Sequence, residues 1–100
     1  MKPIPHPEPD KTYFCLATPA PEYKSEVIEA KKIIDFIDPD TGKEYKAQLE
    51  DMFWYPVDFL SECICKMALN KTANEVRADV MKKYNLKPKQ EIAIIQYKKL

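Results

Sequence analysis

The chain has 100 residues, and its 16 basic and 16 acidic side chains balance at pH 7. That length fits one domain with a modest core, and the balanced charge excludes a global field that attracts nucleic acid, anionic membranes or acidic substrates. The single glycine, Gly42, excludes the glycine-rich phosphate loops of Walker and dinucleotide-binding sites. Any binding of nucleic acid therefore needs a local basic patch.

Residues 1–11 carry a proline at every second position from Pro3 to Pro9. Such a stretch favours an extended, polyproline-like arm and cannot pair as a central strand. We therefore predict an arm over residues 1–11 and a single domain over residues 12–100. His6 lies in the arm, where we expect a solvated side chain.

Neither a signal peptide nor a membrane span is predicted. The arm lacks the apolar segment of a signal peptide, and no run approaches the roughly 18 apolar residues of a membrane-spanning helix. The three cysteines are an odd number, which favours reduced thiols and a cytoplasmic location.

The cysteines predict no metal, cofactor or catalytic site. Cys63 and Cys65 would point to opposite sides of a helix, because two residues span about 200°. We therefore interpret them as structural rather than as zinc ligands. A pair of a cysteine with His6 would place its catalytic base on a flexible arm, so we reject it.

The first half of the chain predicts strands. A short strand is expected at residues 13–17. Residues 22–37 fit a helical stripe, but they also contain β-type residues that lead into an Asp-Pro-Asp-Thr-Gly turn at residues 38–42. A hairpin explains both flanks of that turn, so we predict strands at 27–37 and 44–54. A helix within residues 22–37 remains the alternative.

A helix is predicted after the aromatic run that ends at Tyr55. It is entered at Pro56 or Asp58. Its predicted buried stripe comprises Phe59, Leu60, Cys63, Ile64 and Met67.

The last third of the chain predicts a capped helix and a strand. Thr72 followed by Glu75 is a capping box, and Asn85 suits a left-handed C-cap before Pro88. Residues 92–97 then have apolar groups on both faces, which is typical of a strand inside a sheet.

Candidate ligand-binding residues lie beside the predicted hairpin. Lys31, Lys32 and Lys46 are part of its densest basic strip, where phosphates could bind. Trp54 and Tyr55 point to opposite faces of a strand, and an exposed ring there could stack on a base or fill a groove. A solvated lysine face and aromatic rings packed in the core are the simpler interpretations.

Three segments carry a family resemblance: IIDFIDPDTGKEYKAQLEDM, VDFLSECICKMALNKTANEVRADVMKKY and EIAIIQYKK. In pattern and order over residues 25–98 they resemble the ASCH domains of the PUA-like superfamily. The resemblance implies an α+β fold, a small β-barrel or strongly bent sheet with two helices in its carboxyl-terminal half and a closing strand. It also implies binding of RNA, and in a few members amidohydrolase activity on modified nucleosides. The family's G-x-K-x-x-T-x-R-like stretch is missing here, so no catalytic residue is carried over.

These observations lead to a functional hypothesis with two rivals. The leading one is a non-catalytic domain that binds RNA or a nucleotide-like ligand in a cleft between hairpin and helices. The runner-up is a protein–protein interaction or host-modulating domain, for which the charge balance and the proline arm are the relevant features. A small amidohydrolase acting on a modified nucleoside is the third.

Overall fold

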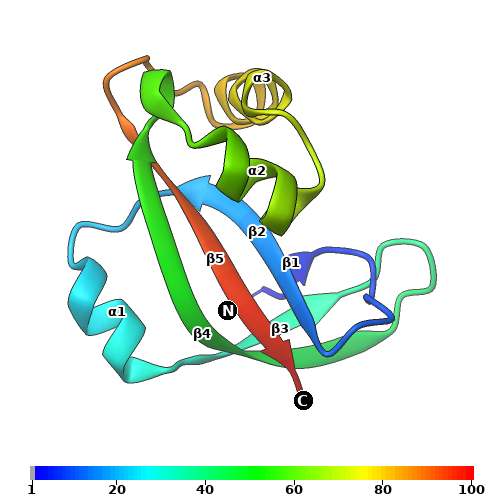
Figure 1. Cartoon of the computed structure of the whole chain (residues 1–100). Helices are drawn as coiled ribbons and strands as arrows, with labels where there is room; N and C mark the ends of the chain where they lie inside the picture. Colours follow the sequence, from blue (N-terminus) through cyan, green and yellow to red (C-terminus); the bar gives the residue numbers. More distant parts are fainter. Residues whose placement is uncertain (1) are drawn as a thin grey trace.

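A computed structural model of the chain describes residues 2–100. It shows an α+β fold in which a five-stranded sheet curls into a half-barrel and three helices pack on it (Figure 1). The strand order is β1-β3-β4-β5-β2, and β1 is parallel to β3 while the other neighbours are antiparallel. The strands are β1 (Ile4–Pro5), β2 (Tyr13–Pro19), β3 (Ile33–Ile37), β4 (Glu44–Pro56) and β5 (Glu91–Lys99). The helices are α1 (Lys24–Ala30), α2 (Glu62–Leu69) and α3 (Ala73–Tyr84), with a 3-10 turn at Val57–Phe59.

Strand β5 carries apolar side chains on both faces and lies between β4 and β2, which confirms the prediction of an internal strand. On one face Ala93, Ile95 and Tyr97 join an aromatic cluster. On the other, Ile92 and Ile94 join a second cluster that includes side chains of α2 and α3.

The aromatic cluster occupies the concave face of the half-barrel. Phe14 of β2 and Phe36 of β3 come from opposite sides of the sheet, yet their ring centroids lie 5.5 Å apart. Only a sheet that curls can bring these two rings together. Tyr45 and Tyr97 complete the cluster at centroid distances of 5.4 Å and 5.2 Å from Phe36.

Residues 22–37 contain both a helix and a strand, so the predicted strand at 27–37 is wrong over its first part. Helix α1 ends at Ala30 with Lys31 as its C-cap, whose φ of 44° is left-handed, and β3 begins at Ile33. Val27 and Ile28 pack against the concave cluster from the helix. Their apolar side chains therefore reach the core without sheet pairing, which the local pattern could not distinguish.

Strand β4 confirms the predicted strand at 44–54 and contains a bulge between Leu49 and Asp51. Before the bulge Tyr45 and Leu49 face the concave cluster, and after it Met52 does. The extra residue shifts the alternation by one position, and bulges of this kind bend and twist a strand.

Helix α2 begins later than predicted. The expected entry at Pro56 or Asp58 is wrong, because Leu60 is extended and the Ser61 side chain caps the helix by accepting a hydrogen bond from Ile64 N at 3.3 Å. The predicted stripe changes accordingly. Phe59 and Met67 are 76% and 79% exposed, whereas Leu60 and Cys65 are buried and Cys63 is exposed.

Helix α3 has the predicted caps. The Thr72 side chain accepts from Glu75 N at 3.2 Å, and the Glu75 carboxylate accepts from Thr72 N at 3.1 Å. Asn85 closes the helix with a φ of 54°. In the described part of the chain, no helix combines the length and the apolar character needed to cross a membrane.

Candidate binding groove

An open groove of about 1340 Å³ runs between the amino-terminal arm, β2 and the helix pair α2–α3. We call it the β2 groove. One wall is formed by His6 and by residues 9–11 of the arm, and the other wall by side chains of α2 and α3. The floor is formed by residues 13–17 of β2 together with Gln96 of β5 and Phe53 of β4. The groove is thus built from segments that are far apart in the sequence.

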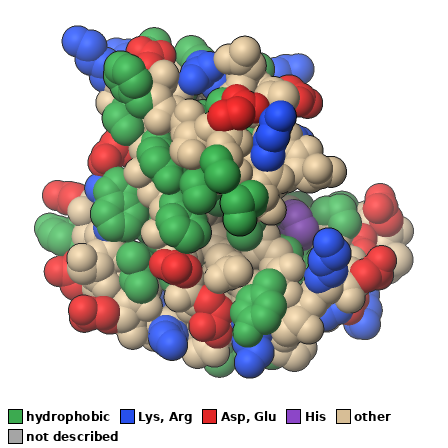
Figure 2. Space-filling model, viewed as in Figure 1, with side chains coloured by type: hydrophobic (Ala, Val, Ile, Leu, Met, Phe, Trp, Pro, Cys, Tyr) green, Lys and Arg blue, Asp and Glu red, His purple; other side chains and the backbone are tan. Residues whose placement is uncertain are grey.

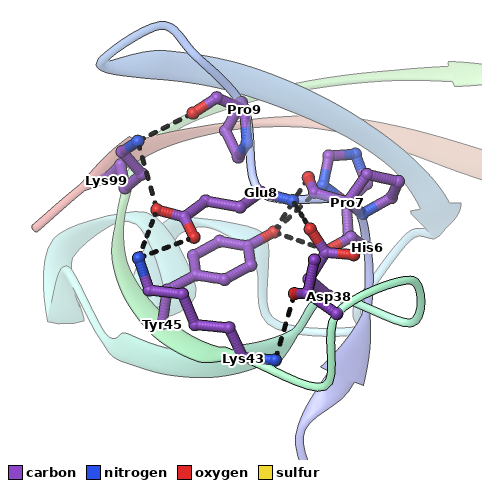
Figure 3. A network of polar contacts seen from close by, with 9 residues as sticks. His6, Pro7, Glu8, Pro9, Asp38, Lys43, Tyr45 and Lys99 are labelled. Carbon is purple, nitrogen blue, oxygen red and sulfur yellow. Dashed lines mark hydrogen bonds and ion pairs between the residues drawn. The ribbon is translucent and has the colours of Figure 1, made fainter.

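The arm is fixed to the sheet by a network of polar contacts (Figure 3). The Tyr45 hydroxyl donates to the carbonyl oxygens of His6 and Pro7 at 2.9 Å and 3.3 Å. Lys99 Nζ donates to the Pro9 carbonyl at 2.7 Å and lies 3.6 Å from the Glu8 carboxylate. These contacts hold the wall of the groove in place beside β2.

Two further contacts hold the middle of the arm. The Glu8 backbone N–H donates to Asp38 Oδ2 at 3.1 Å, and the Glu8 carboxylate pairs with Lys43 Nζ at 3.1 Å. The backbone N–H groups of Glu8 and Asp40 lower the pKa of the Asp38 carboxyl, because they bind its charged form.

The expectation that His6 is solvated is wrong. Its ring stacks on Phe14 with centroids 5.2 Å apart, and its Nδ1 lies 3.1 Å from the Tyr45 hydroxyl. Burial lowers the pKa of His6, and the charge of Lys83 acts in the same direction. The prolines indicated an extended arm, but packing of His6 depends on residues of β2 and β4, which a local pattern cannot reveal.

The opposite wall has an apolar body and a basic rim. Ile64, Met67 and Leu69 line it, and Figure 2 shows hydrophobic side chains gathered in the middle of the face that carries α2. Lys82 and Lys83 stand at the end of α3, and Lys83 Nζ lies 5.3 Å from the Tyr84 ring centroid.

The groove is more basic than the chain as a whole. Its lining includes Lys11, Lys71, Lys82 and Lys83, against the two carboxylates of Asp10 and Asp79. Lys71 is paired with Asp79 at 2.8 Å. Within residues 2–100 no ion pair engages the other three lysines, so the free charge of the groove is positive.

The lysines predicted as ligand-binding residues lie outside the β2 groove. Lys31 and Lys32 are exposed between α1 and β3, and their carbonyl oxygens accept from Gln48 Nε2 at 3.1 Å and Leu49 N at 2.9 Å. Lys46 pairs with Asp35 at 2.7 Å, and this hydrogen bond raises the pKa of Lys46. The structure thus brings the three lysines to the β3–β4 side of the sheet.

Trp54 and Tyr55 lie nearer the other end of β4 and, as predicted, point to opposite faces. Trp54 is 40% exposed, and Lys24 Nζ lies 5.7 Å from its ring centroid. Tyr55 packs against the cluster that includes Ile92. The five predicted residues therefore do not converge on one site.

The groove lining includes one cysteine, Cys15. Burial raises the pKa of the Cys15 thiol, whereas a nucleophilic cysteine needs a lowered pKa. Residues 2–100 contain no group of three or more His, Cys, Asp or Glu side chains placed to hold a metal ion.

Comparison with protein-family models, with curated proteins and with solved structures finds no match.

Proposed function

We propose that this chain is a non-catalytic interaction domain that binds a short polypeptide segment of a partner protein in the β2 groove. The observation that carries the proposal is an apolar wall with a basic rim, because protein interfaces combine an apolar centre with a polar margin. Met67 is 79% exposed and Phe53 38% exposed in this lining. A segment with apolar and acidic side chains would cover both features.

A library of random decapeptides displayed on phage tests the proposal directly. Panning against the full chain should enrich sequences that contain acidic and apolar residues. A synthetic copy of an enriched peptide, labelled with a fluorophore, then gives an affinity by anisotropy. Absence of any enriched peptide would overturn the proposal.

Variants of the rim locate the bound peptide. Lys82→Glu with Lys83→Glu should weaken binding by roughly tenfold or more, which corresponds to about 1.4 kcal/mol. Lys87→Glu with Lys89→Glu is the matched control, since both lysines are exposed and lie outside the groove. Equal losses in both double variants would mean that the peptide binds elsewhere or only through net charge.

Single-stranded RNA is the second candidate, and the ASCH/PUA-like resemblance supports it. The specific observation that favours it is the proximity of free lysines to aromatic rings, since Tyr13 is 50% exposed and lines the same groove. Lysines with stacking rings bind single strands without reading their sequence.

A salt titration with an oligouridine tests RNA binding. Affinity should fall steeply with salt, and the Lys82→Glu and Lys83→Glu double variant should reduce the logarithmic slope by about 1.4. If instead Lys31→Glu with Lys32→Glu carries the loss, RNA lies on the β3–β4 side. No binding at low salt would exclude this candidate.

A further inference from the structure

The longer free edge of the sheet is β2, and two backbone hydrogen bonds to β5 show which of its residues face away from β5. Lys99 N donates to Thr12 O at 2.7 Å, and Ala20 N donates to Glu91 O at 3.1 Å. The register between these bonds is regular. Because backbone groups alternate in direction along a strand, the even-numbered residues of β2 pair with β5.

The odd-numbered residues of β2 therefore direct their N–H and carbonyl groups outward. The Tyr84 hydroxyl confirms this direction independently, since it donates from α3 to the Ala17 carbonyl at 3.5 Å. For Tyr13 and Cys15, residues 2–100 provide no backbone partner on that side. Four main-chain groups of these two residues are thus available.

The β2 groove runs along this free edge. Residues 13–17 line it without interruption, although successive side chains of a strand point to opposite faces of the sheet. Residues of both faces line this groove because it reaches around the edge of β2, and it also extends over the sheet face to Gln96 of β5 and Phe53 of β4. The free main-chain groups of Tyr13 and Cys15 therefore open into it.

We propose that the partner segment binds as an added β-strand on β2, pairing its main chain with Tyr13 and Cys15. The inference rests on the proposed function and specifies its mode. In strand addition, main-chain hydrogen bonds supply affinity and alternate side chains supply specificity. Here one set of side chains would face Met67 and the α2 wall, and the other would face the arm. Because Tyr84 covers the Ala17 carbonyl, the paired stretch is about four residues long.

Charge complementarity identifies the occupant as an acidic segment of another protein. Lys11 stands beside the beginning of the free edge, and Lys83 stands next to Tyr84 at its other end. A segment with an acidic residue toward each end would meet both lysines. A second copy of this chain, paired antiparallel through β2, would place Lys11 of one molecule near Lys83 of the other, and like charges disfavour that arrangement.

Backbone N-methylation of the enriched peptide tests the pairing. One N-methyl group is introduced at each position in turn, which removes a single main-chain donor and leaves the side chains in place. Affinity should fall by roughly tenfold or more at alternate positions over about four residues and change little between them. Full binding of every N-methyl peptide, or losses without alternation, would overturn strand addition and leave the proposed function standing.

A pair of protein variants tests the other strand. Tyr13→Pro removes an outward N–H and no bond to β5, and proline is tolerated at the first residue of a strand. Tyr13→Ala removes the same ring but keeps the N–H. Greater loss of peptide affinity in Tyr13→Pro than in Tyr13→Ala, with equal thermal stability of the two proteins, supports the pairing, and equal loss contradicts it. Light scattering of the free protein then measures its oligomeric state. If the natural chain is a dimer and the Tyr13→Pro variant is a monomer, the edge pairs with a second copy of the chain instead of a partner segment.

Discussion

Tyr45 ties the arm to the sheet through one hydroxyl group. Its ring stacks on Phe36 in the concave cluster, and its hydroxyl donates to the His6 carbonyl at 2.9 Å. Burial raises the pKa of Tyr45 to about 12, with the carboxylates of Asp38 and Glu8 adding to the shift. The hydroxyl therefore keeps its proton and remains a donor throughout the neutral and mildly alkaline range.

Replacing Tyr45 by Phe should separate the hydroxyl from the ring. Tyr45→Phe keeps the stacking on Phe36 but removes the donor to the arm, so the free energy of unfolding should fall by about 1 kcal/mol. Urea unfolding followed by circular dichroism measures the change. Tyr23→Phe is the control, since Tyr23 is 64% exposed, and its change should stay within about 0.5 kcal/mol. Equal effects would mean that the Tyr45 hydroxyl does not stabilise the arm.

The ring of His6 should make stability depend on pH. Burial lowers its pKa in the folded state below the usual 6.5, so the unfolded chain takes up the proton first. The contribution of His6 to stability is therefore complete above about pH 6.5 and is lost as the pH falls toward the lowered value. Urea midpoints at pH 7.5 and 5.5 should differ more for the natural chain than for His6→Gln. An equal decrease in both proteins would assign the pH dependence to other groups.

At the scale of elements, the caps of α3 should account for a measurable part of its stability. Thr72→Ala removes the side-chain oxygen that accepts from Glu75 N, and loss of such a cap costs about 1 kcal/mol. Thr72→Ser keeps the oxygen and should remain within a few tenths of a kcal/mol of the natural chain. Chemical unfolding of the three proteins provides the comparison. A Ser variant as unstable as the Ala variant would point to the threonine methyl group instead.

Elements with local signals were predictable, and elements defined by tertiary contacts were not. The capping box at Thr72, the C-cap at Asn85 and the two apolar faces of β5 all depend on neighbouring residues. In contrast, α1 has no side-chain N-cap bond. Its Val27 and Ile28 pack against the concave cluster, and their apolar pattern along the chain fits a strand as well as a helix.

At the scale of the whole molecule, the grouping of basic residues along the chain does not predict the candidate groove. The sequence points to Lys31, Lys32 and Lys46 because they lie beside the predicted hairpin. The β2 groove instead joins the arm, β2 and the α2–α3 pair. Lys11 and Lys83 line the same groove because α3 packs against β2, and no residue pattern near either lysine signals that arrangement.

Removing the arm tests how far it is part of the domain. Deletion of residues 1–9 removes β1, the His6–Phe14 stack and the contacts of Glu8, leaving one end of the concave cluster uncovered. The free energy of unfolding should fall by more than about 2 kcal/mol, the value of one large apolar side chain. Denaturant unfolding and the binding of a hydrophobic dye measure the loss.

A single charge substitution separates packing from ion pairing in that experiment. Glu8→Gln removes the pairs with Lys43 and Lys99. These pairs are partly exposed, so the cost should be at most about 1 kcal/mol. If Glu8→Gln were as damaging as the deletion, the arm would be held by charge rather than by packing.

The position of β5 also determines the order in which the sheet can form. Tyr13 of β2 pairs with Lys98 of β5 across most of the sequence, whereas β3 and β4 form a local hairpin. Loop-closure entropy delays distant pairings, so we expect β2 to dock last. Until then Ile92–Ile95 of β5 form an apolar edge that is open to other molecules. Refolding yield should therefore fall as protein concentration rises, and a yield independent of concentration would show that β2 docks early.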